Sequence, residues 1–220
     1  MFDRPDSSFA LKFQLPKIYA VTNAEISGLS HVEQVEALIA GGIKIIQLRE
    51  KHLSPRDFFE AAKPAIKLAR EYRVKMIIND RVDIAMALDA DGVHLGQDDL
   101  SPEHARKILG PDAMIGFSTH SIEQAVAAMH LPVDYLAVGP IFSTSTKEKA
   151  DPVIGTEVLR VIKQRIAPLP LVAIGGINRG NILDVLTSGA DSAAIIGGLV
   201  TRAGNITVNA KELISLADTV

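Results

Sequence analysis

Short apolar runs alternate with amphipathic segments along almost the whole chain. Eight runs have the length of a β-strand, and they fall at residues 17–21, 43–48, 74–78, 92–95, 114–117, 135–141, 171–174 and 192–196. Most of them are continuously apolar, which is typical of parallel strands buried on both faces. The pattern therefore predicts repeated β–α units built around a parallel sheet.

Helix-start signals separate these runs. Residues 30–33 and 121–124 have the spacing of a capping box, in which the first and last side chains cap each other's backbone. Residues 54–55 and 101–102 are Ser-Pro pairs, which place a cap before a proline at the first helical position. A helical segment follows Arg81, and further helices are expected at residues 155–166, 181–186 and 208–217.

Eight β–α units in 220 residues predict an α/β fold, a (β/α)8 TIM barrel in a single domain. We expect the barrel to span residues 17–220 and an N-terminal arm to span residues 1–16. A doubly wound open sheet is the structural alternative, but no G-x-G-x-x-G fingerprint follows the first strand. The barrel is therefore the favoured fold.

The composition narrows the class of function. Hydrophobic residues make up 47% of the chain and aromatic residues only 5%, so the core must be mostly aliphatic. The absence of cysteine excludes disulfides and thiolate metal sites, and a net charge of -3 without a basic stripe gives no indication of nucleic-acid binding. The N-terminal residues resemble neither a signal peptide nor a membrane span, so we expect a cytoplasmic protein with no membrane partner. The oligomeric state stays open, with a homo-oligomer among the options.

Polar side chains follow several expected strands at their carboxyl ends, where TIM barrels carry their active sites. They are Gln47, Arg49, Lys51, Asn79, Asp80, Asp98, Asp99, Ser118, His120, Thr144, Ser145, Thr146 and Lys147. Asp80 and Asp99 follow consecutive strands, and carboxylates gathered this way either bind a hard cation such as Mg²⁺ or cap helices. With such a cation, the three basic residues of the set could hold a diphosphate.

Glycine pairs end the last two expected strands. Gly176 and Gly197 can bring backbone N–H groups close to an anion, and the positive end of the helix that begins at Asn181 would add to this. The same pairs fit simple tight turns equally well. Two anion sites, one of them with a metal, point to a transfer between two phosphorylated molecules in which diphosphate leaves.

Several motifs, in order, resemble those of the thiamine-phosphate synthase family. They are QLREK at 47–51, NDR at 79–81, DGVHLGQDD at 91–99, GFSTH at 116–120, GPIFSTSTK at 139–147 and AIGGI at 173–177. The resemblance implies a Mg²⁺-dependent transferase of thiamine biosynthesis with a TIM-barrel fold. Such an enzyme moves the 4-amino-2-methylpyrimidin-5-ylmethyl group from its diphosphate to a thiazole phosphate, through a pyrimidine carbocation. The products are thiamine phosphate and diphosphate.

The resemblance also implies roles for individual residues. The set on the pyrimidine diphosphate would be Gln47, Leu48, Arg49, Glu50, Lys51, Asn79, Ser118 and Lys147. The set on the thiazole phosphate would be Thr144, Ser145, Thr146, Gly176, Ile196 and Gly197. Lys51, Ser118 and Lys147 would be catalytic, and Asp80 and Asp99 would bind Mg²⁺. Two positions depart from the family pattern, because Ser145 replaces a common proline and Gly197 a common serine.

Two other functions stay open. Thiazole tautomerases resemble this chain in fold and use a histidine where it has His120, but they typically lack the NDR, QDD and loop-lysine features. A catalytically silent phosphate-binding or regulatory barrel would be favoured by loss of Arg49, Asp80 or Lys147, and all three are present. Apart from the resemblance, we expect His94 to be a hydrogen-bonded strand-end residue, and Glu50 to point outward as a solvated charge or to pair with a cation.

Overall fold

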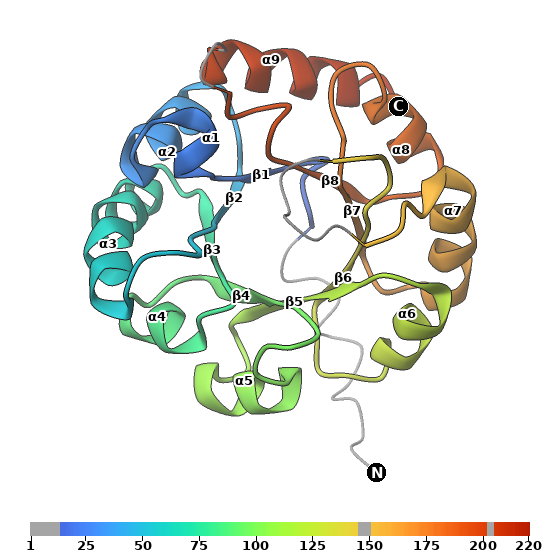
Figure 1. Cartoon of the computed structure of the whole chain (residues 1–220), viewed down its shortest axis with the longest axis horizontal. Coiled ribbons are helices and arrows are strands. Elements are labelled where there is room, and N and C mark those ends of the chain that lie inside the picture. The colour runs from blue at the N-terminus through green and yellow to red at the C-terminus, as the bar shows by residue number, and fades with distance from the viewer. Residues whose placement is uncertain (1–13, 145–150, 202–204) are drawn as a thin grey trace.

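The structure, a computed structural model, describes residues 14–144, 151–201 and 205–220. Its strands form one closed parallel barrel in which neighbours in sequence pair and β8 pairs with β1 (Figure 1). They are β1 (Ile18–Val21), β2 (Ile45–Leu48), β3 (Lys75–Asn79), β4 (Gly92–Leu95), β5 (Met114–Thr119), β6 (Tyr135–Val138), β7 (Leu171–Ile174) and β8 (Ser192–Ile195). The predicted TIM barrel is confirmed, and the open sheet is wrong.

Helices follow the strands and surround the barrel (Figure 1). They are α1 (Ala24–Ser27), α2 (His31–Ala40), α3 (Pro55–Glu71), α4 (Val82–Ala87), α5 (Pro102–Leu109), α6 (Ile122–Ala128), α7 (Gly155–Ile166), α8 (Ile182–Thr187) and α9 (Ile206–Ala217). The sequence did not predict α1, because a single turn of four residues has no room for a helical period. The side chain of Asn23 caps this turn by accepting the Ile26 N–H.

The core has two layers because side chains alternate along each strand. Ile46, Leu48, Met76 and Ile78 point outward and pack under the helices in the larger cluster of buried residues. The inner cluster fills the barrel itself, and its members are Tyr19, Val21, Ile45, Ile77, Tyr135, Ala137, Val172 and Ala194. The barrel is therefore a packed cylinder, and ligands can reach only its ends.

Two local expectations need correction. The sixth strand ends at Val138 rather than at residue 141, since Pro140 has no N–H to continue the ladder. At α6, Ser121 accepts the Gln124 N–H as expected, but the Gln124 side chain accepts the N–H of His120, one residue before the cap. The start of α6 is thus capped without the reciprocal bond of a capping box.

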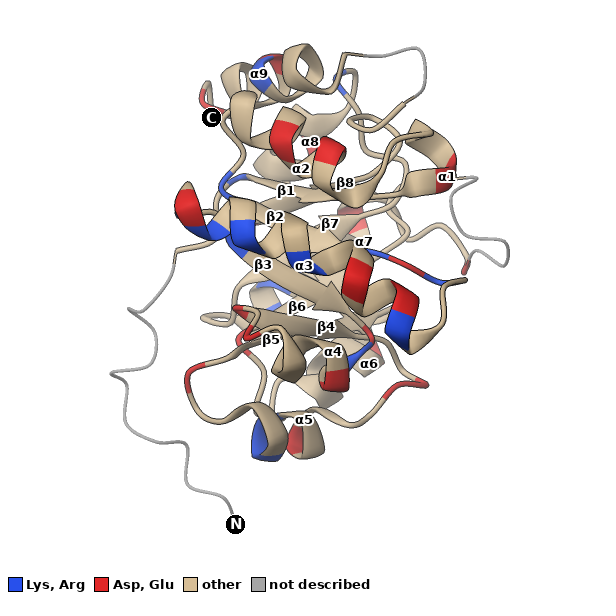
Figure 2. Ribbon diagram, turned by 90° about the vertical axis from the view of Figure 1, so that its left-hand side faces the viewer, with Lys and Arg blue, Asp and Glu red and all other residues tan. Residues whose placement is uncertain are grey.

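Charged residues lie mainly on the helices and loops that surround the strands (Figure 2). Among the residues coloured in that view, acidic and basic ones are interspersed, and these described residues form no continuous basic stripe across it. Within the described ranges, no helix is long and apolar enough to cross a membrane.

Candidate active site

Two carboxylates meet at the carboxyl ends of β3 and β4. Asp80, directly after β3, has a left-handed backbone with φ of 61°, and its N–H donates to the carbonyl of His94 at 2.8 Å. Asp99 is held from the other side, because its Oδ2 accepts the N–H of Gly96 at 2.6 Å. Burial raises the pKa of Asp99, and the adjoining carboxyl of Asp80 raises it further. The two acids are thus close enough to repel each other when both are ionised.

Lys51 joins this pair from the loop after β2. Its ammonium forms an ion pair with Oδ2 of Asp80, and its charge lowers the pKa of Asp99 against the larger effect of burial. The three side chains come from the ends of three different strands, and barrel closure brings them together. We call this cluster, with its supporting loops, the carboxylate half of the mouth.

The chemistry of the acidic pair fits a divalent cation. Carboxylate oxygens are hard ligands, and a dication between two repelling carboxylates would remove their repulsion. In the part of the chain that the structure describes, no group of three or more His, Cys, Asp and Glu residues could hold a metal. An ion at Asp80 and Asp99 would therefore take most of its ligands from water or substrate phosphate, as Mg²⁺ commonly does.

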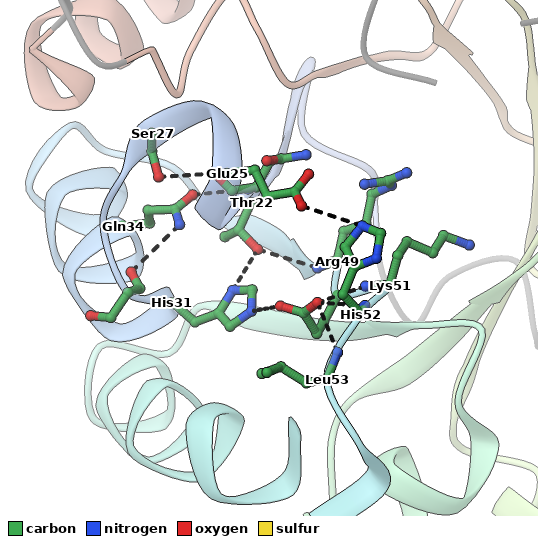
Figure 3. Close-up of polar contacts among 12 residues, drawn as sticks. Thr22, Glu25, Ser27, His31, Gln34, Arg49, Lys51, His52 and Leu53 are labelled. Carbon is green, nitrogen blue, oxygen red and sulfur yellow. Dashed lines mark hydrogen bonds and ion pairs between the residues drawn. The ribbon is translucent and has the colours of Figure 1, made fainter. Parts of the chain in front are cut away.

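The Glu50 carboxylate organises the loop that carries Lys51. Figure 3 shows Lys51, His52 and Leu53 of this loop. Its Oε1 accepts the N–H groups of Lys51 and His52 at 2.8 Å and that of Leu53 at 3.3 Å, while Oε2 lies 3.4 Å from Nε2 of His31. Burial works against the ionised form, but these hydrogen bonds hold the pKa of Glu50 below its usual value. The expectation that Glu50 points outward was wrong, since its side chain is only 12% exposed.

A second polar network supports the same loop from β1 (Figure 3). Thr22 is fully buried, and its Oγ1 accepts the N–H of Arg49 at 3.2 Å and lies 3.1 Å from Nδ1 of His31. Burial lowers the pKa of His31, and its contact with Glu50 opposes this. The main chain that carries Arg49 and Lys51 is therefore held by hydrogen bonds from the N–H groups of residues 49, 51, 52 and 53.

A chain of hydrogen bonds crosses the inside of the barrel from Gln47 to Ser118. Nε2 of Gln47 donates to the Tyr19 hydroxyl at 3.2 Å, which lies 2.9 Å from the Tyr135 hydroxyl. The Tyr135 hydroxyl lies 3.0 Å from Nδ1 of His94, and Nε2 of His94 lies 2.8 Å from Oγ of Ser118. His94 is hydrogen-bonded through both ring nitrogens, as expected of a strand-end histidine.

Burial determines the protonation of the side chains in this series of hydrogen bonds. It raises the pKa of Tyr19 to about 12 and that of Tyr135 well above its usual value, and it lowers the pKa of His94 to about 4. All three groups are therefore neutral near pH 7. The sequence did not predict this chain, because its members are up to 116 residues apart.

Asn79, the last residue of β3, presents an open donor at the mouth. Its side chain is buried, and its Nδ2 has no hydrogen-bond partner within the described structure. A buried amide donor without a partner is costly, so such an atom in a binding site is commonly satisfied by a ligand.

Glycine forms the opposite side of the mouth, at the ends of β7 and β8, which we call the glycine half. Gly175 and Gly176 have φ of 102° and 66°, and a Cβ on Gly176 would lie 2.6 Å from the carbonyl oxygen of Ser143. The carbonyl of Gly176 accepts the side-chain amides of Asn178 and Asn181. Around Gly197, by contrast, no atom lies within 4 Å of where a Cβ would be. This side is therefore bare backbone, tight at Gly176 and open at Gly197.

The remaining predicted residues are placed as follows. Leu48 is fully buried under the helices, so only its main chain is available to a ligand. Ile196 is half-buried beside Gly197, and Thr144 is the last described residue before a gap. His120 lies at the start of α6, where its Nδ1 bonds the carbonyl of Gly139 at 2.7 Å. Ser145, Thr146 and Lys147 lie outside the described residues.

Known proteins are similar to this chain in both sequence and fold. A family profile described as thiamine monophosphate synthase matches residues 18–199, from β1 to beyond β8. The chain belongs to this family. Two relatives named thiamine-phosphate synthase agree with the profile. The one from Chloroflexus aurantiacus is 45% identical over 91% of this chain and 92% of its own, and that from Caldanaerobacter subterraneus is 43% identical over 90% and 91%.

A solved structure extends the likeness to three dimensions. Thiamine phosphate pyrophosphorylase from Pyrococcus furiosus superposes with a TM-score of 0.83 at 37% identity, covering 92% of this chain and 96% of that one. As a member of the thiamine monophosphate synthase family, the chain is a transferase of thiamine biosynthesis. The carboxylate half and the glycine half lie on opposite sides of the same end of this barrel.

Proposed function

We propose that the chain transfers a pyrimidinylmethyl group from its diphosphate to the ring nitrogen of a thiazole phosphate. The bond between the methylene carbon and the diphosphate oxygen breaks, and its electron pair leaves with the diphosphate. The thiazole nitrogen then forms the new bond to the carbon, so thiamine phosphate and diphosphate are the products. The observation that carries this proposal is the convergence of Lys51, Asp80 and Asp99 opposite a glycine-lined backbone.

The carboxylate half suits the diphosphate. Asp80 and Asp99 would hold Mg²⁺, which when bound would stabilise negative charge on the leaving diphosphate. Lys51 adds a cation that is already placed by its ion pair with Asp80, and Arg49 adds another from the same pinned loop. Donors and charges that are fixed before the reaction stabilise a developing anion without reorganising, and each is worth roughly a hundredfold in rate.

The inner polar residues suit the pyrimidine. Gln47, next to last in β2, and Asn79, at the end of the neighbouring β3, point inward, and the free Nδ2 of Asn79 would supply a donor for a ring nitrogen. Ser118 lies across the barrel, where its hydroxyl would meet the diphosphate near the carbon that reacts. Lys147, Ser145 and Thr146 lie outside the described residues. In this proposal Lys147 would bind the diphosphate, and Thr144, Ser145 and Thr146 would bind the thiazole phosphate.

The glycine half suits the second phosphate. Gly176 and Gly197 leave backbone close to the opening, and phosphate oxygens commonly bind such bare N–H groups after the seventh and eighth strands of TIM barrels. The nucleophile belongs to the thiazole, so the chain needs to supply none. Its task is to hold two anionic substrates so that the carbon and nitrogen lie within bonding range.

A two-substrate assay tests this function. The full chain is mixed with the pyrimidine diphosphate, the thiazole phosphate and Mg²⁺, and we expect thiamine phosphate and diphosphate in equal amounts. In a thermal-shift experiment, the pyrimidine diphosphate should raise the melting temperature only when Mg²⁺ is present. Stabilisation by the thiazole phosphate alone, with no product from the two substrates, would instead support a tautomerase-like barrel.

A further inference from the structure

The buried chain from Gln47 to Ser118 allows only two arrangements of its protons. Each phenol carries one hydrogen, and a neutral imidazole carries one N–H. Tyr19 and Tyr135 are buried, and within the described structure their hydroxyls have no partners outside these contacts, so a phenol hydrogen turned elsewhere would be an unsatisfied donor. With all four contacts made and both phenol hydrogens donated, every group must therefore donate in the same direction. Either Ser118 receives a hydrogen from His94 Nε2, or it gives its own hydrogen to that nitrogen.

The Gln47 end selects one arrangement. Its Nε2 faces the Tyr19 hydroxyl, and an amide nitrogen can only donate. Tyr19 must then donate to Tyr135, and Tyr135 to Nδ1 of His94. The partners of both ring nitrogens are hydroxyls rather than carboxylates, and the ring is buried against the Tyr135 ring at a centroid distance of 5.6 Å. A neutral imidazole in this setting has its hydrogen on Nε2.

Gly116 provides independent support, because it leaves the space in which the chain is made. A Cβ at this position would overlap the Tyr135 hydroxyl and Nδ1 of His94, the two atoms that form the middle contact. Gly116 has no positive φ and ends no helix, so its backbone does not require glycine. The missing side chain serves the contact between Tyr135 and His94.

We infer that Tyr19 and Tyr135 hold His94 as the Nε2–H tautomer, and that His94 in turn directs the hydroxyl hydrogen of Ser118 toward the mouth. All three are positioning residues. Ser118 thereby meets an anionic ligand as a hydrogen-bond donor. In the reverse arrangement, only its lone pairs would face the anion. The consequence for catalysis rests on the proposed function, since the anion would be the leaving diphosphate, whereas the tautomer does not.

The tautomer can be measured without any substrate. In the ¹⁵N-labelled full chain, a long-range ¹H–¹⁵N spectrum distinguishes protonated from unprotonated ring nitrogens, and the His94→Gln variant identifies the His94 signals. We expect a protonated Nε2 and an unprotonated Nδ1. A protonated Nδ1, or a mixture of the two forms, would overturn the inference whether or not the chain makes thiamine phosphate.

A substitution of Tyr135, in the middle of the series of hydrogen bonds, tests whether the tautomer affects the rate. Tyr135→Phe removes the hydrogen that holds Nδ1, so we expect mixed tautomers and a roughly tenfold lower kcat, with little change in either KM. Tyr72→Phe is the matched control, because Tyr72 is 60% exposed and distant from the chain. If Tyr135→Phe kept both the wild-type spectrum and the wild-type kcat, His94 would not depend on Tyr135, and the inference would fail. Failure of the wild-type chain to form product would count against the proposed function alone.

Discussion

At the ends of β2 to β5 an anionic ligand would be met by side chains, whereas at the ends of β7 and β8 it would be met by bare backbone. In the carboxylate half, the side chains that would bind the anion or its metal are themselves positioned by other residues. Glu50 and Thr22 hold the Lys51 loop, and the N–H of Gly96 holds Asp99. The glycine half needs only room, and Gly176 and Gly197 provide it in different degrees.

The difference teaches how each half can fail. A site made of fixed charges loses its function when a group is removed or when its support moves, often with the fold intact. A site made of backbone has no group to remove, and it fails when an atom is added. Substitutions of the two kinds should therefore separate the halves in both activity and stability.

The largest effect is expected from Asp80→Asn. The substitution removes one of the two carboxylates of the proposed Mg²⁺ site but keeps a residue type that tolerates the left-handed φ of 61°. We expect kcat/KM to fall roughly a thousandfold in the two-substrate assay, with the circular dichroism spectrum unchanged. Asp83→Asn is the control, because this carboxylate is exposed and pairs with Arg81. Loss of less than tenfold at Asp80 would reject it as a ligand.

Glu50→Ala tests a residue that supports the Lys51 loop rather than one that contacts the ligand. Without the carboxylate, the N–H groups of Lys51, His52 and Leu53 lose their acceptor, so the main chain that carries Lys51 is no longer fixed. We expect the KM for the pyrimidine diphosphate to rise roughly tenfold or more while that for the thiazole phosphate changes little. Glu50→Gln should restore part of the loss, since its Oε1 can still accept. Glu25→Ala is the matched control, a side chain 74% exposed that contacts His52 in the same loop. Equal effects of the two alanine variants would contradict a special role for Glu50.

In the glycine half, Gly176→Ala should damage stability and binding together. The new Cβ would lie 2.6 Å from the Ser143 carbonyl oxygen on a backbone with positive φ, so we expect the free energy of unfolding to fall by about 2 kcal/mol or more. The KM for the thiazole phosphate should rise with it. Gly155→Ala separates strain from overlap, because Gly155 has φ of 76° but no atom within 4 Å of its Cβ position. Urea unfolding of both variants gives the comparison, and equal losses would show that overlap at Gly176 costs nothing.

The smallest effect is expected from Gly197→Ser. No atom would touch the added Cβ, and its φ is not positive, so the free energy of unfolding should stay within about 0.5 kcal/mol of the wild type. A new hydroxyl beside the proposed phosphate site should lower the KM for the thiazole phosphate about fivefold, the value of one added hydrogen bond. Gly197→Ala provides the control without a hydroxyl, and equal KM values in the two variants would place the phosphate elsewhere.

Much of the carboxylate half was visible in the sequence. Asp80 and Asp99 lie within four residues of the ends of two consecutive short apolar runs, and the parallel arrangement puts the ends of those runs at one edge. The inward fold of Glu50 was missed, although a carboxylate just before three successive loop N–H groups is a local signal that could have suggested it. The usual assumption that an isolated Glu beside Lys and Arg is solvated concealed it.

The series of hydrogen bonds from Gln47 to Ser118 could not be predicted from the sequence in this way. Strand periodicity places Tyr19 and Tyr135 on the inner face, but their contact depends on how the barrel closes and staggers. The signal in hindsight is Gly116, a residue without a side chain inside a strand, which often marks a place where another group approaches closely.

The left-handed backbone at Asp80 has an evolutionary consequence. The main chain restricts this position to the few residue types that tolerate such a conformation, and the proposed Mg²⁺ site requires a carboxylate, so two independent demands converge on one amino acid. Glutamate satisfies the second demand but not the first, and asparagine or glycine the first but not the second. Any substitution at this position therefore fails one of the two demands, so the residue cannot change without a loss.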